Sequence, residues 1–205
     1  MSSEAPTRRR RPDGERSRRA ILRAAAELAT VEGLEGLSIG RLAEETGMSK
    51  SGLYAHFASK QALQLATVET ANEIFDVEVV QPALGAREGR ERLVALCDAY
   101  LSHLQRDVFP GGCFFAATAA DFGMRPGPVR DAIRDAWTAF EGLVAELIED
   151  ARAKEEIAAE PETEQLAFEL IGYLGGANAS FVLFRDPVVL ERARRAVRTR
   201  LAVGP

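Results

Sequence analysis

The stretch SIGRLAEETGMSKSGLYAHF, residues 38–57, decides the fold of this chain. It predicts two short helices joined by a tight turn. Ser38 and Ser49 are each suited to cap a helix N-terminus, and Gly47 follows the first helix, where glycine most easily adopts a left-handed backbone. Apolar residues recur at helical spacing on the inward face of each helix: Ile39, Leu42 and Ala43 in the first, and Leu53, Tyr54 and Phe57 in the second. This pattern is typical of a helix-turn-helix, whose second helix can lie in the major groove of DNA.

The outward positions of this stretch carry side chains that can reach DNA. Lysine, serine, tyrosine and histidine offer donors for phosphates and base edges, while glycine and alanine allow a helix to approach the groove closely. Lys60 adds a cation in the first turn of the next helix, whose N-terminus also favours phosphate. The residues expected to contact DNA are Arg16, Arg18, Ser38, Ser49, Lys50, Ser51, Gly52, Tyr54, Ala55, His56 and Lys60.

These motifs resemble a known family. MSKSGLYAHFASKQAL (residues 48–63), with the preceding SIGRLAEETG and ILRAAAELATVEG, is similar to the DNA-binding domain of the TetR family of transcriptional regulators over roughly residues 15–75. The serine-lysine pair, the aromatic-x-His-Phe end and the serine-lysine opening of the next helix occur in register. Ala29 and Leu34 stand where larger aromatic residues are common in the family, so packing in the small N-terminal core must differ. The resemblance implies a double-stranded DNA operator as partner.

Charge is distributed unevenly along the chain. The net charge is −5 over 205 residues, but residues 1–60 hold eleven Lys and Arg against eight Asp and Glu, a net +3, whereas residues 61–205 carry −8. A basic front end on an acidic body localises attraction to DNA at one end.

Helical periodicity interrupted by proline and glycine continues through the chain, and no stretch alternates as a strand would, so we expect an all-α fold. We expect a disordered basic arm at 1–14, a three-helix DNA-binding domain at 15–75, and a helical effector-binding and dimerisation domain at 76–205. The run Arg8 to Arg11 is either an arm that contacts DNA or a solvated basic tail. Helices are expected at about 15–32, 60–80, 88–105, 114–122 and 129–153, from Pro161 onward through 184, and from Pro187 to the C-terminal arginines.

Aromatic residues cluster in the middle of the chain. The corresponding helices of TetR-like regulators surround a small-molecule pocket, so the resemblance implies an unidentified small-molecule effector, and aromatic residues with a few polar groups suit such a pocket. The alternative is that they fill a helical core. The candidate lining residues are Tyr100, His103, Phe114, Phe115, Phe122, Trp137 and Phe140.

The segment LIGYLGGANASFVLF, residues 170–184, is rich in small residues that form helices weakly. Small residues allow two backbones to approach closely, and TetR-like proteins usually dimerise through their last two helices. The alternative is that the glycines make room for a ligand or a neighbouring helix within one subunit. A dimer would read two half-sites about 34–36 Å apart. The candidate interface residues are Gly172, Gly176, Ala179, Phe181 and Phe184.

Other functional classes find little support in the sequence. His56 and His103 lie far apart, Cys97 and Cys113 lack CxxC spacing, and no GxxxxGK[ST] loop occurs, so no metal, no cofactor and no enzymatic activity is expected. No secretory or membrane-spanning segment is expected, and two cysteines suit a reducing cytoplasm. We therefore predict a cytoplasmic, homodimeric repressor released from a palindromic operator by a small molecule. The alternatives are an architectural DNA-binding protein, or a redox-sensing regulator acting through Cys113.

Overall fold

The computed structural model describes residues 10–202, and the side chains from residue 14 onward. Every regular element in that part of the chain is a helix, so the all-α prediction is confirmed. The elements are α1 (Arg10–Glu32), α2 (Ile39–Thr46), α3 (Lys50–Tyr54), α4 (Lys60–Phe75), a π-helical turn (Asp76–Val80), α5 (Gln81–Leu84), α6 (Arg90–Gln105), α7 (Phe114–Phe122), α8 (Pro128–Ala153), α9 (Thr163–Phe184) and α10 (Val188–Arg200).

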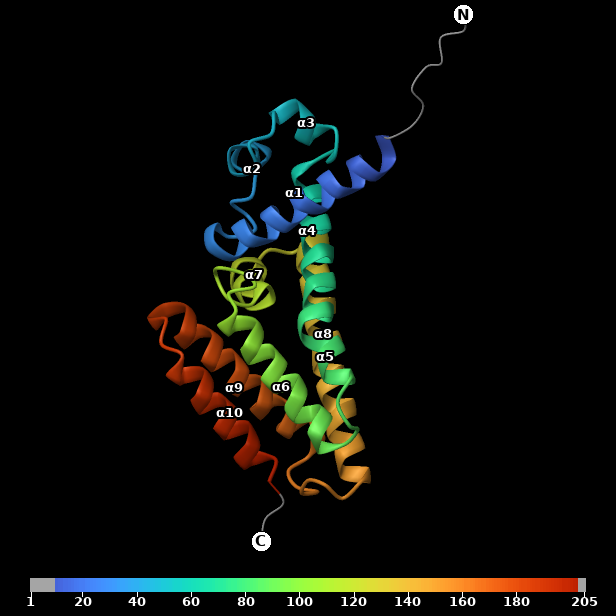
Figure 1. Cartoon of the computed structure of the whole chain (residues 1–205), viewed down its shortest axis with the longest axis vertical. Coiled ribbons are helices and arrows are strands. Elements are labelled where there is room, and N and C mark those ends of the chain that lie inside the picture. The colour runs from blue at the N-terminus through green and yellow to red at the C-terminus, as the bar shows by residue number, and fades with distance from the viewer. Residues whose placement is uncertain (1–9, 203–205) are drawn as a thin grey trace, which may run out of the picture.

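The molecule has a small head and a larger body (Figure 1). Helices α1, α2 and α3 form the head, and α10, the last helix, lies in the body. Helix α4 begins in the head and runs down into the body alongside α8, with which it makes direct contacts. Helix α7 lies beneath α1 and packs against it. The head is therefore joined to the body through both α4 and α7.

Helix α1 begins at Arg10, earlier than the predicted start at Glu15. Residues 10–14 of the predicted disordered arm are therefore helical, which corrects that boundary. Pro12 does not prevent this, because the first amides of a helix have no intrahelical partner and proline is tolerated in the first turn. The rest of the predicted arm, including Arg8 and Arg9, lies outside the described residues.

The helix that starts at Lys60 was predicted to stop before Pro82, but it continues through the proline to Leu84. A π-helical turn makes this possible. The amide of Gln81 donates to the carbonyl of Asp76, five residues back, and the next residue is the proline, which has no amide to leave unpaired. The wider turn thus absorbs the residue that would break a regular α-helix.

The starts of the last two helices are also slightly different from those expected. Helix α9 begins at Thr163 rather than at Pro161, with Glu164 in its first turn. Helix α10 begins at Val188 rather than at Pro187, which lies at the N-cap position, and the Val188 amide donates to the Asp186 carboxylate at 2.9 Å. Among the described residues, α9 is the helix long and apolar enough to cross a membrane by length and composition, a criterion that core helices of other proteins also meet.

Candidate nucleic-acid interface and ligand cavity

The two helices of the head have the predicted caps. The Ser38 hydroxyl accepts from the Arg41 amide at 3.2 Å, and Gly47 ends α2 with φ of +67°. The Ser49 hydroxyl accepts from the Gly52 amide at 3.2 Å at the start of α3. A Cβ on Gly52 would lie 3.2 Å from that hydroxyl, so the small residue leaves room for the cap. Local hydrogen bonds and the left-handed Gly47 therefore determine where α2 ends and where α3 begins.

Helix α3 is short and presents one outward face. Leu53 and Phe57 are buried, whereas Tyr54 is 64% exposed. The prediction that Tyr54 packs inward is wrong, and the side chain is free for a partner instead. Of the eleven residues expected to contact DNA, Arg16, Ser38, Ser49, Lys50, Ser51, Tyr54, Ala55 and Lys60 are exposed, and Arg18, Gly52 and His56 are half-buried.

The half-buried members of this set also hold the head together. The Arg18 guanidinium donates to the His56 carbonyl at 3.4 Å and lies 5.0 Å from the centre of the Phe57 ring. Both contacts tie α1 to the turn that follows α3. Arg18 therefore positions the recognition helix, and its contact with phosphate stays a prediction.

Lys60, at the start of α4, forms an ion pair in this structure. Its ammonium lies 3.0 Å from the Glu35 carboxylate, and the hydrogen bond from Lys60 is the main reason why the pKa of Glu35 is lowered. Both side chains are more than a third exposed, so the pair is screened and a phosphate can compete for the lysine.

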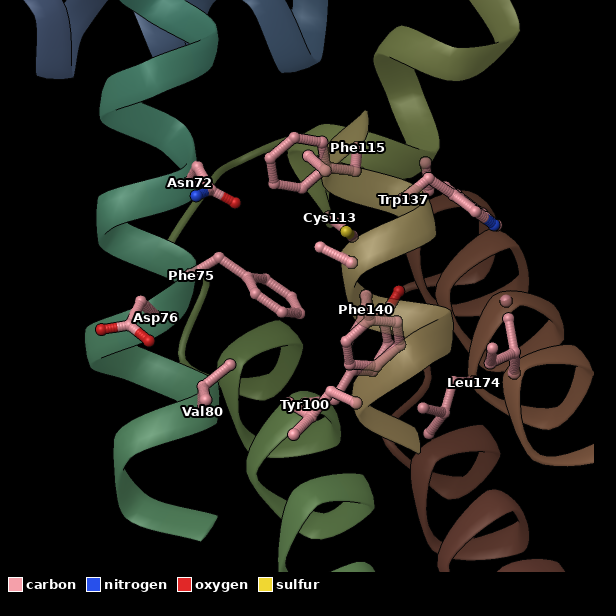
Figure 2. A pocket seen from close by; sticks show the side chains of 16 residues that line it. Asn72, Phe75, Asp76, Val80, Tyr100, Cys113, Phe115, Trp137, Phe140 and Leu174 are labelled. Carbon is pink, nitrogen blue, oxygen red and sulfur yellow. The ribbon is translucent and has the colours of Figure 1, made fainter. Parts of the chain in front are cut away.

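A cavity of about 230 Å³ lies in the body between α4, α6, α7, α8 and α9 (Figure 2). Four of the seven predicted lining residues, Tyr100, Phe115, Trp137 and Phe140, surround it. Phe75 projects from α4 into their midst, edge-on to Phe140 at 5.4 Å and to Tyr100 at 6.2 Å between ring centres. The full lining is Asn72, Phe75, Asp76, Val80, Tyr100, Cys113, Phe115, Ala116, Ala136, Trp137, Ala139, Phe140, Leu143, Ile171, Leu174 and Gly175.

Three predicted lining residues lie elsewhere. His103 and Phe114 are each only 1% exposed and belong to the core next to the cavity. Phe122 is buried beside a separate, more open cleft between α7 and α8, which Trp137 also borders. These three residues lie on faces of α6 and α7 that point away from the cavity. The positions of aromatic residues in the sequence do not show which face of a helix borders a cavity.

Sequence reasoning missed the contribution of α4. It sought the pocket only in the middle of the chain, whereas Asn72, Phe75, Asp76 and Val80 come from α4 and its π-helical turn. The sequence does contain a signal for this contribution. Asn72 and Asp76 are polar residues about one turn apart on either side of Phe75, in a segment whose other marked residues are apolar.

His103 is the buried polar side chain of this region with no hydrogen-bond partner for either ring nitrogen. Phe75 and Phe109 pack against its ring, with centres 6.1 and 5.6 Å away. Burial lowers the pKa of His103 from 6.5 to about 4, against an opposing effect of Glu78. The imidazole is therefore neutral at pH 7 in the folded protein.

His103→Leu is expected to make the protein less sensitive to acid. In the unfolded chain the histidine gains a proton as the pH falls below ~6.5, whereas in the folded protein it does so only near pH 4. Folding stability present above pH 6.5 is thus lost as the pH falls toward 4, by at most about 3 kcal/mol. Urea unfolding at pH 7.5 and pH 5 measures the loss for both proteins. An equal loss in the variant would contradict this assignment.

The two cysteines are buried and unpaired. Burial raises the pKa of Cys97 to about 12 and raises that of Cys113 as well, so both are thiols at neutral pH. The thiolate is the reactive form, and a buried thiol in apolar surroundings reacts slowly. Among the described residues, no group of three His, Cys, Asp or Glu side chains could hold a metal ion.

An apolar stripe runs along the exposed side of α9. Phe168, Leu183 and Phe184 are 74%, 73% and 69% exposed, and Gly172, Gly176 and Ala179 lie exposed between them. A Cβ added to either glycine would meet no atom within 4 Å, so no neighbouring helix of the same subunit requires them. Phe181 is only 7% exposed and belongs to the core of the subunit, which corrects its assignment to the interface.

Head and body are linked by specific polar contacts. The Asp121 carboxylate, near the end of α7, accepts from the backbone amide of Glu35 at 2.9 Å. The Thr30 hydroxyl of α1 accepts from the Gly111 amide at 3.0 Å, in the loop that precedes α7. The Arg23 guanidinium donates to the Val108 carbonyl at 2.6 Å. Helix α1 is therefore held by the same segment of the body whose residues Cys113 and Phe115 line the cavity.

A capped helix-turn-helix carried on a helical body with an apolar cavity defines a DNA-binding transcriptional regulator. Two family models match the chain: "Bacterial regulatory proteins, tetR family" over residues 21–67, and "Tetracyclin repressor-like, C-terminal domain" over residues 89–197. The chain belongs to the TetR family of transcriptional regulators.

Individual relatives agree with this assignment. The transcriptional regulator AcuR of Cereibacter sphaeroides is 24% identical over 180 residues, which is 86% of this chain and 82% of that protein. The class C tetracycline repressor of Escherichia coli is 46% identical over 52 residues, 25% of this chain and 24% of that protein. A TetR transcriptional regulator from Chloroflexus aurantiacus matches the structure with a TM-score of 0.84 at 26% identity, covering 92% of this chain and 95% of that one.

Proposed function

We propose that the protein is a homodimeric repressor that leaves a near-palindromic operator when a small molecule fills the cavity. The observation that carries the proposal is that α4 and α7 each touch both the cavity and the head. In this proposal, residues 15–75 form the DNA-binding domain and residues 76–205 form the effector-binding and dimerisation domain. The protein would act in the cytoplasm, where the DNA is.

The first connection runs along α4. Lys60 at its start is expected to bind phosphate, and Asn72 and Asp76, three and four turns further on, line the cavity. A ligand that pushes Asn72 and Asp76 outward would move α4, and α4 would transmit the movement to the head at its other end. The spacing of the two heads on DNA would change with it.

The second connection runs along α7. Phe115 lines the cavity, and Asp121 on the same helix holds the amide of Glu35, whose carboxylate pairs with Lys60. A shift of α7 on ligand binding would be passed to the loop between α1 and α2. A coupling free energy of about 1–3 kcal/mol between the two sites changes occupancy five- to 150-fold.

Regulators of the same fold provide supporting examples. The structure of AibR in complex with isovaleryl coenzyme A and operator DNA matches with a TM-score of 0.73 at 20% identity, covering 91% of this chain and 99% of that one. A regulator from Saccharomonospora viridis in complex with choline matches with a TM-score of 0.73 at 23% identity, covering 90% of this chain and 95% of that one. By analogy, DNA and a ligand are the partners proposed here.

The alternatives fit the structure less well. An architectural DNA-binding protein has no need of an apolar cavity, whereas this body contains one of about 230 Å³. A redox sensor acting through Cys113 would need an activated thiolate, and burial raises the pKa of that thiol. A ligand-responsive regulator is therefore the function favoured.

Operator binding is expected to weaken steeply with salt, because phosphate contacts release counterions from DNA. The operator is first found by genome-wide footprinting, and fluorescence anisotropy then measures the dissociation constant from 50 to 300 mM salt. We expect the logarithm of the association constant to fall linearly with the logarithm of the salt concentration, with a slope of roughly −5 to −8 for two heads. A compound that raises the melting temperature should also reduce operator occupancy. A flat salt response, or ligands that bind without releasing the operator, would count against the proposal.

A further inference from the structure

The cavity carries an unbalanced negative charge. Among the sixteen lining residues that the structure describes, Asp76 is the one carboxylate, and burial raises the pKa of the other two acidic groups, the Tyr100 phenol and the Cys113 thiol. No lysine, arginine or histidine is among the lining residues that the structure describes. The site therefore offers an anionic ligand no counter-charge.

The carboxylate of Asp76 is not neutralised by the protein around it. Its hydrogen-bond donor is the uncharged Gln81 amide, at 3.2 and 3.3 Å. The other aspartates whose side chains the structure describes each pair with an arginine or lysine or, like Asp186, cap a helix: Asp98, Asp107, Asp121, Asp131, Asp135, Asp150 and Asp186. Asp76 is an exception among them, and it stands at a cavity.

The polar and apolar linings lie at different depths. Asn72 on α4 is exposed, and Asp76, the first residue of the π-helical turn, is half-buried, so they form the more solvent-accessible part of the lining. Phe75, Phe115 and Leu174 are buried and form the inner wall. The π-helical turn begins at Asp76 and ends at Val80, and both residues line the cavity. A ligand that fits would have an apolar body inside and a polar end beside Asp76.

Aromatic rings reinforce the preference for positive charge. Five rings line the cavity, and the faces of aromatic rings attract cations by about 0.5–2 kcal/mol, more when water is excluded. An isolated anion in such surroundings would lose its hydration without compensation. The carboxylate of Asp76 and the aromatic lining thus both favour a positively charged ligand.

We propose that the effector is a hydrophobic organic cation, an amine or quaternary ammonium compound whose charged end lies beside Asp76 and whose apolar body fills the aromatic interior. This inference rests on the proposed function, because it assigns the ligand class of the cavity through which the regulator would respond.

Three probes of one shape test the assignment: benzyltrimethylammonium, its uncharged carbon isostere neopentylbenzene, and the anion 3-phenylpropionate. Binding is followed by the fluorescence of Trp137, the single tryptophan of the chain, which lines the cavity. We expect the cation to bind at least about tenfold more tightly than the anion. Equal or tighter binding of the anion would overturn the inference but leave the cavity, and the proposed function, in place.

The matched variants are Asp76→Asn and, as control, Asp135→Asn, which removes the carboxylate of an exposed residue of α8 that does not line the cavity. Asp76→Asn should weaken binding of the cation about three- to tenfold and leave that of neopentylbenzene unchanged, while Asp135→Asn changes neither. Melting temperature and operator affinity verify that both variants are folded. An equal effect of Asp76→Asn on the cation and the neutral probe would overturn the role of the charge. If Trp137 fluorescence is changed neither by the two ions at millimolar concentration nor by neopentylbenzene at its solubility limit, the inference fails and the proposed function loses its ligand site.

Discussion

Gly176→Arg is expected to convert the protein from dimers to monomers and to reduce operator affinity by about 100-fold or more. A Cβ at this position meets no atom within 4 Å in a single subunit, so the arginine fits the isolated fold and replaces a weak helix former. In a dimer packed through α9, the same side chain would place bulk and charge between two helices. Two linked heads gain about 10²–10⁴ in avidity over one head, and this gain would be lost.

Sedimentation velocity measures the oligomeric state, and anisotropy with the footprinted operator measures affinity. Gly142→Arg is the matched control, because Gly142 is also an exposed helical glycine, on α8, with no atom within 4 Å of an added Cβ. The control should stay dimeric and bind the operator normally. If Gly176→Arg behaved like the control, the exposed stripe on α9 would not be the dimer interface.

Tyr54→Ala is expected to weaken operator binding by roughly 30-fold or more while leaving dimerisation and melting temperature unchanged. The side chain is 64% exposed on the outward face of α3, so its removal costs the free protein little. A contact with phosphate or a base edge is worth about 1–3 kcal/mol, and a dimer loses it twice. The affinity of Tyr54→Phe for the operator should show how much of this loss is due to the hydroxyl group alone.

Val31→Ala provides the control for this variant. Val31 lies in the head on α1 and is exposed to the same extent as Tyr54, at 64%, but it is not on the recognition helix. The Val31→Ala variant should bind the operator with the same affinity as the wild type. Unchanged affinity in Tyr54→Ala, measured by the same titration, would remove Tyr54 from the DNA interface.

The DNA-facing head could be predicted almost entirely from local sequence. The caps at Ser38 and Ser49 and the left-handed Gly47 occur as expected, because a cap depends only on a side chain and an amide a few residues apart. The position of Tyr54 could not be decided in this way. On a helix of five residues, periodicity leaves an inward and an outward face equally possible, and only packing against α2 distinguishes them.

The cavity required the tertiary structure. Helical periodicity identified the aromatic residues of α6 to α8, but His103 and Phe122 face away from the cavity, while Phe75 and Asp76 reach it from a helix about 25 residues earlier in the chain. The π-helical turn that carries α4 past Pro82 was likewise invisible, because its pattern differs from an α-helix by one residue per turn.

By itself, the amino-acid sequence determined the helical class, the family, the helix-turn-helix and the small-residue stripe of α9, since each depends on residues close together in the chain. The tertiary structure alone decided which side chains meet across helices: the lining of the cavity, the burial of Phe181, and the contacts of Asp121 with Glu35 and of Glu35 with Lys60. The physical reason is that caps and periodicity are local, whereas a cavity and its unpaired charge arise only when helices distant in sequence pack together.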